Sequence, residues 1–215
     1  MTNTSAQMEA NQIQENDNAA PVPTENNASP ERPMKHPLEH EWTFWFFENN
    51  KSKAWLDNLH EVYTFNTIED FWCLYNHIRN VEDLTPGNDY MVFKHGIEPK
   101  WEDSRNHRGG RWLINVDSRN KHRLNEMWLN VILFMIGESF DEYSDQICGA
   151  FINIRAKVDR ISLWTTDASK INETEAIGRK LKYECLHLDD QRIPYETHSD
   201  SQSKSGSKAR STMVC

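Results

Sequence analysis

Phe151-Ile-Asn-Ile-Arg-Ala-Lys-Val-Asp-Arg-Ile-Ser-Leu-Trp164 alternates apolar and polar residues on both sides of Val158-Asp159. This pattern is typical of two half-buried strands joined by a tight turn. With a two-residue turn at Val158-Asp159, antiparallel pairing would place Lys157 opposite Arg160, Arg155 opposite Ser162, and Asn153 opposite Trp164. The segment therefore predicts a β-hairpin in an antiparallel sheet.

One face of this predicted hairpin is basic. Residues that are paired, or two apart on a strand, share a face, so Arg155, Lys157, Arg160 and Trp164 would point the same way. Like charges placed opposite each other destabilise a sheet, and a phosphate chain would relieve the repulsion. A solvated basic face is the alternative. Because Val158 suits a turn with positive φ poorly, a longer turn would change the pairing register.

Working outward, further strands are predicted from Glu41 onward and at Val62–Phe65, Asp89–Phe93, Arg111–Val116, Gly149–Lys157, Arg160–Thr165 and Tyr183–His187. Helices are predicted over Asn66–Ile78, Arg123–Ile136 and Asn172–Lys182, from capping boxes and 3.6-residue periodicity. The two kinds of element do not alternate regularly, which favours an α+β domain with a mainly antiparallel sheet.

The chain has 215 residues, and its two ends differ from the middle. Residues 1–33 are almost free of large apolar side chains, so a disordered N-terminal tail is predicted there, followed by a single domain over 34–215. Residues 199–215 are rich in Ser with scattered basic residues and are predicted to be a mobile C-terminal loop or tail.

Charge and cysteine usage exclude several classes of protein. The net charge is −9, of which the tail carries −4, so the domain is a poor general binder of nucleic acid and an anion site must be local. The four cysteines are widely spaced, which indicates reduced thiols in an intracellular protein and no metal site. No apolar run is long enough to cross a membrane.

Trp101-Glu102 lies in a polar loop and suggests how a base could be bound. An indole face can stack on a base, and a carboxylate can accept both N–H groups of the guanine edge. A second loop tryptophan, Trp55, could complete a sandwich, to which a positively charged 7-methylguanine adds a cation–π attraction. For any single tryptophan, burial in the core is the alternative.

Motifs of nucleotide-processing enzymes are missing. The sequence contains no Walker loop, no GxSxG elbow and no HExxH, and Gly109-Gly110 is too short a glycine signature to cradle a triphosphate. No cofactor and no catalytic residue are predicted.

Several stretches together resemble the eukaryotic translation initiation factor 4E family of messenger RNA cap-binding proteins. The matching stretches are His36-Pro-Leu, Trp45-Phe-Phe, Lys51-Ser-Lys-Ala-Trp55, Glu69-Asp-Phe-Trp72, Gly96-Ile-Glu-Pro-Lys-Trp101-Glu-Asp, Arg108-Gly-Gly-Arg-Trp112, Ile136-Gly-Glu-Ser-Phe-Asp141, Asp145 to Lys157 and Leu163-Trp-Thr-Thr166. The resemblance covers about residues 36–207. It implies a strongly curved, mainly antiparallel sheet of about eight strands, with three helices on its convex face and the cap on the concave face.

The resemblance also assigns roles to residues of this chain. It implies that Trp55 and Trp101 sandwich 7-methylguanine, that Glu102 binds the edge of the base, and that Trp164 contacts the methyl group. The implied phosphate-binding residues are Arg155, Lys157 and Arg160, with Arg111 in support.

On the opposite face, the resemblance implies a surface for a Tyr-x-x-x-x-Leu-Φ helix of initiation factor 4G or of 4E-binding repressors. Its residues would be His36, Pro37, Leu38, Ile68, Trp72, Leu129 and Leu133. Asn130 departs from the acidic residue common in animal relatives, which puts partner strength or choice in doubt. Ser207 resembles a regulatory phosphorylation site.

The resulting hypothesis is a cytoplasmic cap-binding initiation factor, with a nuclear or RNA-granule location left open. Trp55, Trp101 and Trp72 favour an initiator, whereas Asn130 keeps a cap-binding repressor open as the alternative. An interaction module with a vestigial pocket and a nucleotide-processing enzyme are the remaining alternatives.

Overall fold

The computed structural model describes residues 34–117, 119–202 and 213–215 of the chain. The predicted N-terminal tail over residues 1–33 and the candidate phosphorylation site Ser207 lie outside the described residues. Of the predicted C-terminal segment 199–215, the described parts belong to helix α4 (His198–Gln202) and strand β8 (Met213–Val214), and β8 pairs with the sheet.

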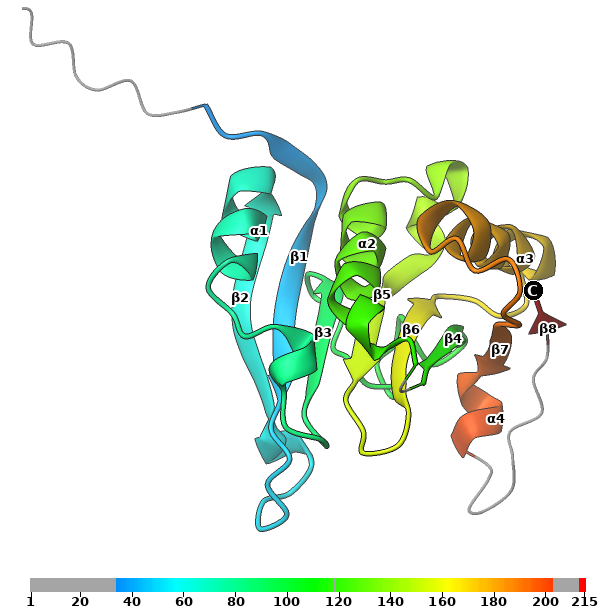
Figure 1. Cartoon of the computed structure of the whole chain (residues 1–215). Coiled ribbons are helices and arrows are strands. Elements are labelled where there is room, and N and C mark those ends of the chain that lie inside the picture. Colours follow the sequence, from blue (N-terminus) through cyan, green and yellow to red (C-terminus); the bar gives the residue numbers. More distant parts are fainter. Residues whose placement is uncertain (1–33, 118, 203–212) are drawn as a thin grey trace, which may run out of the picture. The chain divides into compact units, whose positions relative to one another are not determined.

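A single eight-stranded sheet forms the centre of the fold (Figure 1). Its strands follow the order β2-β1-β3-β5-β6-β4-β7-β8, and every neighbouring pair is antiparallel. The bounds are β1 Pro37–Phe47, β2 Leu59–Thr67, β3 Asp89–Lys94, β4 Gly110–Val116, β5 Ile147–Asn153, β6 Asp159–Thr165, and β7 Pro194–Thr197. The predicted α+β class with an antiparallel sheet of about eight strands is confirmed.

Strand β1 shows why the sheet is covered on both faces. Successive side chains point to opposite sides of a strand. Trp42 and Phe44 are buried in the main core, whereas Trp45 and Phe47 pack against a second cluster. Two shifts of register between β1 and β2 mark irregularities that bend such a pair.

Three helices of eight residues or more lie on one face of the sheet (Figure 1). They are α1 Ile68–Tyr75, α2 Leu124–Ile136 and α3 Ile171–Arg179, as predicted to within a few residues. The side chain of Thr67 caps α1 by accepting from the amide of Asp70 at 3.2 Å, which is half of a predicted capping box. The cap predicted for α3 at Asn172 is wrong, because α3 begins one residue earlier and Lys170 makes no side-chain cap.

The predicted strand Tyr183–His187 is wrong. Residues Lys180–Cys185 continue α3 as a short π-helix, η5. Leu181 and Cys185, four residues apart, are both buried. The apolar spacing of this stretch serves helical packing, which short windows do not distinguish from a strand.

The predicted register of the β5–β6 hairpin is also wrong, because the turn is longer. Asn153 pairs with Arg160, and the loop between the strands runs over residues 154–158. Arg155 and Lys157 therefore lie in the loop and not on a strand. The shift is an even number of residues, so the faces survive: Ile161 and Leu163 still point into the main core.

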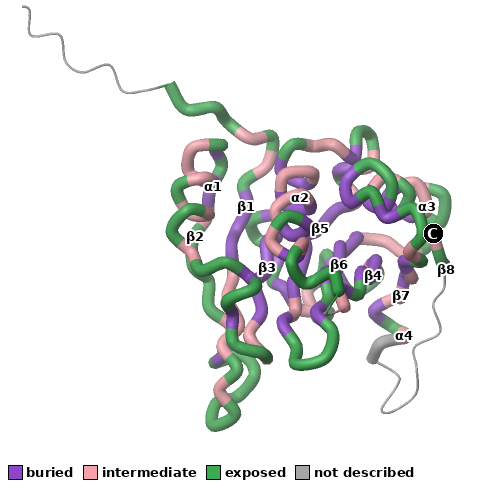
Figure 2. Tube along the Cα trace, in the orientation of Figure 1, coloured by how far each residue is buried: buried purple, intermediate pink, exposed green. Residues whose placement is uncertain are grey.

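The main core lies between the sheet and the helices, and the buried segments of the central strands run through the middle of Figure 2. Trp42, Trp112 and Trp128 are fully buried there. No helix in the described part of the chain is both long and apolar enough to cross a bilayer.

Candidate functional site

The face of the sheet that points away from the helices carries its own apolar cluster. Its buried members are Met91, Phe93, Ile97, Cys148, Phe151 and Trp164, with Trp45, Phe47 and Leu59 packed against them. Sequence reasoning found Trp164 but missed Phe93 and Phe151. β3 and β5 carry apolar side chains on both faces, and Phe93 and Phe151 alternate with the main-core residues of these strands. That pattern could have indicated a second buried face.

Trp55 is presented on the loop between β1 and β2, just before the 3-10 turn η1 (Leu56–Asn58). Its side chain is 48% exposed, and its ring lies 5.6 Å from that of Phe47, between centroids. The loop is braced from inside by Asn58, whose amide nitrogen donates to the carbonyl of Asn50 at 2.9 Å. An exposed indole is thus held at the edge of the apolar cluster.

Trp101 and Glu102 are exposed on the long loop between β3 and β4. The fully buried side chain of Asn106 ties this loop together by donating to the carbonyls of Glu98 at 2.9 Å and of Lys100 at 2.8 Å. Such internal bonding holds the indole and the carboxylate outward, where a planar ligand could stack on one and bond to the other.

Trp164, on β6, is not exposed like the two loop tryptophans. Only 4% of its surface is accessible, and its ring stacks on Phe151 with centroids 5.0 Å apart and planes 24° apart. The ring of His198, which sequence reasoning missed, also lies against Trp164, with centroids 4.1 Å apart. Trp164 is therefore a buried member of the apolar cluster and not an exposed indole.

His198 is a buried histidine with both ring nitrogens unpaired among the described residues. Burial, helped by the positive charge of Arg111, lowers its pKa to about 3, so the ring is neutral near pH 7. The indole N–H of Trp164 also lacks a partner in the described part of the chain. No sequence pattern marked His198, since it lies far from Trp164 along the chain.

Two of the predicted phosphate-binding cations share the face of Trp164. Arg111 pairs with Trp164 across the strands, and its guanidinium lies 3.4 Å from Glu196. Burial lowers its pKa, an effect that Glu196 opposes. Arg160, four residues before Trp164 on β6, is exposed and donates from Nε to the side-chain oxygen of Asn115 at 3.1 Å.

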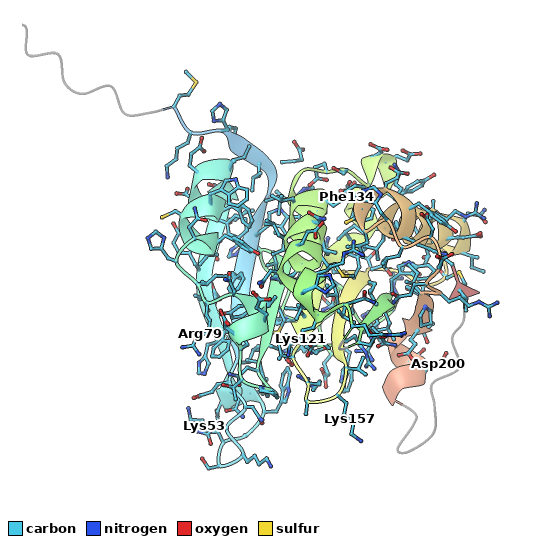
Figure 3. All side chains as sticks on the ribbon, in the orientation of Figure 1. Lys53, Arg79, Lys121, Phe134, Lys157 and Asp200 are labelled. Carbon is cyan, nitrogen blue, oxygen red and sulfur yellow. The ribbon has the colours of Figure 1, made fainter. Side chains whose placement is uncertain are left out.

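Arg155 and Lys157 reach the same region from the β5–β6 loop. The guanidinium of Arg155 makes two hydrogen bonds to the buried carboxylate of Asp89, with Nη2 and Oδ2 3.0 Å apart. The Arg155 amide donates to Asp159 at 2.8 Å, which shapes the loop. Lys157 is exposed with no ion pair among the described residues. Figure 3 shows Lys157 and Lys53, of the Trp55 loop, at the same end of the sheet.

Asp89 is a further residue of the site that sequence reasoning missed. Its side chain is buried, and burial raises its pKa although the hydrogen bonds from Arg155 act against this. The hydrogen bond to Asp89 in turn raises the pKa of Arg155. This pair leaves Arg155 charged and half exposed, with the unpaired side of its guanidinium available to an anion.

On the helix side, the predicted partner-binding residues gather around α1 and α2. His36 precedes β1 and contacts α1: its amide donates to a carboxylate oxygen of Glu69 at 2.9 Å, and its carbonyl accepts from the Ile68 amide at 2.9 Å. Ile68 is 44% exposed. Leu38, Trp72, Leu129 and Leu133 are only partly buried at the edge of the main core. Pro37 is exposed at the start of β1.

The described residues contain no group of three or more His, Cys, Asp or Glu side chains placed to hold a metal ion. The side chains of the site offer surfaces for stacking, acceptors for the N–H groups of a base edge, and arginine and lysine charges that can neutralise an anion.

Residues 37–213 match the family model described as eukaryotic initiation factor 4E. The human eukaryotic translation initiation factor 4E is 48% identical over 196 residues, which cover 89% of this chain and 90% of the human protein. The factor from Aplysia californica is 46% identical over 195 residues, covering 90% and 91%.

Solved structures of similar proteins include ligand complexes. Ascaris suum eIF4E-3 with an m7G cap superposes with a TM-score of 0.79 at 42% identity, covering 84% of this chain and 98% of that one. A schistosome eIF4E in complex with m7GpppA and 4E-BP gives a TM-score of 0.79 at 35% identity, covering 85% and 100%.

Proposed function

This chain belongs to the eukaryotic initiation factor 4E family, and from that premise we propose that it binds the 7-methylguanosine cap of messenger RNA and recruits a 4G-type scaffold to start translation. The m7G cap bound by the similar Ascaris protein supports the ligand, and the 4E-BP bound by the schistosome protein supports a helical partner.

One observation carries the cap-binding proposal: two exposed indoles and an exposed carboxylate stand on internally braced loops, and one of the indoles, Trp55, borders the buried aromatic cluster. Trp55 and Trp101 would sandwich the methylated base, and Glu102 would accept its N–H groups. Trp164 would lie beneath the methyl group. A cation held between two indoles gains roughly 2 kcal/mol when it is desolvated.

The phosphates of the cap would extend towards the basic end of the sheet. Lys157 is exposed there, and Arg155 and Arg160 are also exposed, while Arg111, largely buried on the same face of the sheet as Arg160, would support them. Because each of the three arginines is held by Asp89, Asn115 or Glu196, little side-chain entropy would be lost on binding.

The partner would bind on the helix side of the sheet. A Tyr-x-x-x-x-Leu-Φ helix needs a shallow apolar groove, and the partly exposed Ile68, Trp72, Leu129 and Leu133 offer one. Asn130, partly exposed on α2, cannot form a salt bridge with a basic partner residue. We also propose that the protein acts in the cytoplasm as a binding protein without a catalytic step.

Titration with 7-methyl-GTP and with GTP, followed by tryptophan fluorescence, tests the cap-binding proposal. We expect 7-methyl-GTP to quench the fluorescence and to bind about thirtyfold more tightly than GTP, the equivalent of about 2 kcal/mol. Equal affinities would contradict the sandwich. Glu102→Gln is expected to weaken both ligands, since the amide nitrogen cannot accept the base N–H groups.

A further inference from the structure

A separate cavity of 630 Å³ opens at the end of β3 that carries Lys94, whereas Asp89 and the proposed cap phosphates are at the other end. Its lining combines strand residues with Arg105 from the Trp101 loop and Asp145 from η4 (Asp141–Gln146). Cavities of this size are typical of small-molecule sites. None of the residues proposed to bind the cap lines it.

Lys94 is a buried cation that lacks an anion. Only 7% of its surface is accessible, and its Nζ donates to the carbonyl of Ser144 at 3.0 Å. The ring of Trp42 lies 5.9 Å away. Within the described residues, no carboxylate oxygen lies within 4.0 Å of Nζ. Burial lowers the pKa of Lys94, and the carboxylates of Glu138 and Asp145 only partly offset this.

Arg105 is the second unpaired cation of the cavity. Its main chain is fixed, because its amide donates to Asp103 at 2.8 Å and its carbonyl accepts from the thiol of Cys148 at 3.6 Å. Its guanidinium makes no ion pair with any residue that the structure describes. A fixed backbone with an unengaged guanidinium suits a ligand that arrives from solvent.

Each carboxylate that lines the cavity lies near a histidine ring. Glu41 lies 3.7 Å from Nε2 of His95, and Asp145 lies 3.8 Å from Nε2 of His40. The Asp145 side chain is 89% exposed, so it lies at the rim. The cavity therefore combines the buried ammonium of Lys94 with the exposed guanidinium of Arg105, and neither cation has a carboxylate within ion-pair distance among the described residues.

We propose that this cavity is a second anion site, which binds the phosphate group of a small phosphorylated molecule between Lys94 and Arg105. Lysine would act as a buried point charge, and arginine would provide a forked pair of donors to two phosphate oxygens. The site does not depend on the proposed cap-binding function, because the two sets of residues are different.

Titration of the full-length 15N-labelled chain with inorganic phosphate, at constant ionic strength, tests this proposal. We expect the amide signals of Gly96 and Ile97, which line the cavity, to shift and saturate. Arg105→Gln and Lys94→Met are each expected to weaken the binding that these signals report by about tenfold, since a charge-assisted bond is lost. Signals near Arg111 and Arg160 report the proposed cap site separately.

Arg108→Gln is the matched control, because Arg108 belongs to the same loop but lies outside the cavity, 3.7 Å from Asp167. It should leave the Gly96 and Ile97 shifts unchanged. Shifts that do not saturate, or that keep the same midpoint in Arg105→Gln, would overturn the proposal. Arg105 is exposed, so its substitution keeps the test valid if Lys94→Met fails to fold.

Discussion

Arg155 and Asp89 form a bidentate ion pair in which the carboxylate is buried and the guanidinium is half exposed. The pair connects the β5–β6 loop to the start of β3. It determines where the loop that also carries Lys157 lies, so a residue assigned to the ligand also stabilises the site.

Arg155→Met should therefore cost stability as well as ligand affinity. The substitution leaves a buried carboxylate without its partner, and we expect the free energy of unfolding to fall by about 1–3 kcal/mol. This loss is smaller than that for breaking a fully buried ion pair, because Arg155 is half exposed. Urea unfolding measures this. Lys157→Met, on the same loop, should change stability by less than about 0.5 kcal/mol. Equal effects of the two substitutions would contradict the structural role of Arg155.

His198→Gln should change how stability depends on pH. The pKa of His198 is lowered to about 3 in the folded protein, against about 6.5 when unfolded, so the unfolded state binds the extra proton between these values. The contribution of His198 to stability is thus lost as the pH falls below 6.5, by about 2 kcal/mol between pH 7 and pH 5. Urea midpoints of the wild type should show this loss.

The same midpoints in His198→Gln should fall less over this range, because glutamine does not titrate. His107→Gln, on the exposed β3–β4 loop, is the control and should keep the wild-type pH dependence. If His198→Gln and the wild type lose stability in parallel, His198 is not the group responsible.

Substitutions of Trp101 and of Trp164 should separate effects on ligand binding from effects on stability. Trp101→Ala is expected to weaken 7-methyl-GTP binding by about thirtyfold and to leave the unfolding free energy within about 0.5 kcal/mol, because the indole is exposed. Trp164→Ala should cost about 3–5 kcal/mol of stability, since it empties a buried site. Calorimetry and urea unfolding provide both values.

Trp164→Phe keeps much of the buried volume and should recover most of that stability. A Trp101→Ala variant as unstable as Trp164→Ala would show that Trp101 is a core residue.

Trp72→Ala should abolish binding of the helical partner and leave binding of the cap unchanged. Trp72 is partly exposed on α1, and its ring contacts Phe71 and Tyr75 at centroid distances of 5.0 Å and 5.9 Å. Binding of a Tyr-x-x-x-x-Leu-Φ peptide is expected to weaken by about thirtyfold or more, as for an aromatic anchor. Fluorescence anisotropy of a labelled peptide measures this. Cys73→Ser, exposed next to it, should bind normally, and loss of 7-methyl-GTP affinity in Trp72→Ala would argue against a surface role.

Periodicity identified most of the elements of this fold. The apolar pattern from Glu41 onward predicted a strand, and the cap of Thr67 marked the start of α1 to within two residues. These signals are local, because a strand or helix repeats its pattern within a few residues. The strand predicted at Tyr183–His187 was wrong. Leu181 and Cys185, four residues apart, fit a helix, but so short a stretch also fits a strand.

Local pattern alone was also sufficient to put the apolar side of the β5–β6 hairpin in the main core, since the side-chain period of two survives an even shift of register. Only the tertiary structure decided the length of its turn. Asp89, over 60 residues earlier in the chain, bonds Arg155 and holds it off the strand. His198 reaches Trp164 in the same way, through the order of strands in the sheet. Contacts between distant residues depend on that order, which no short segment encodes.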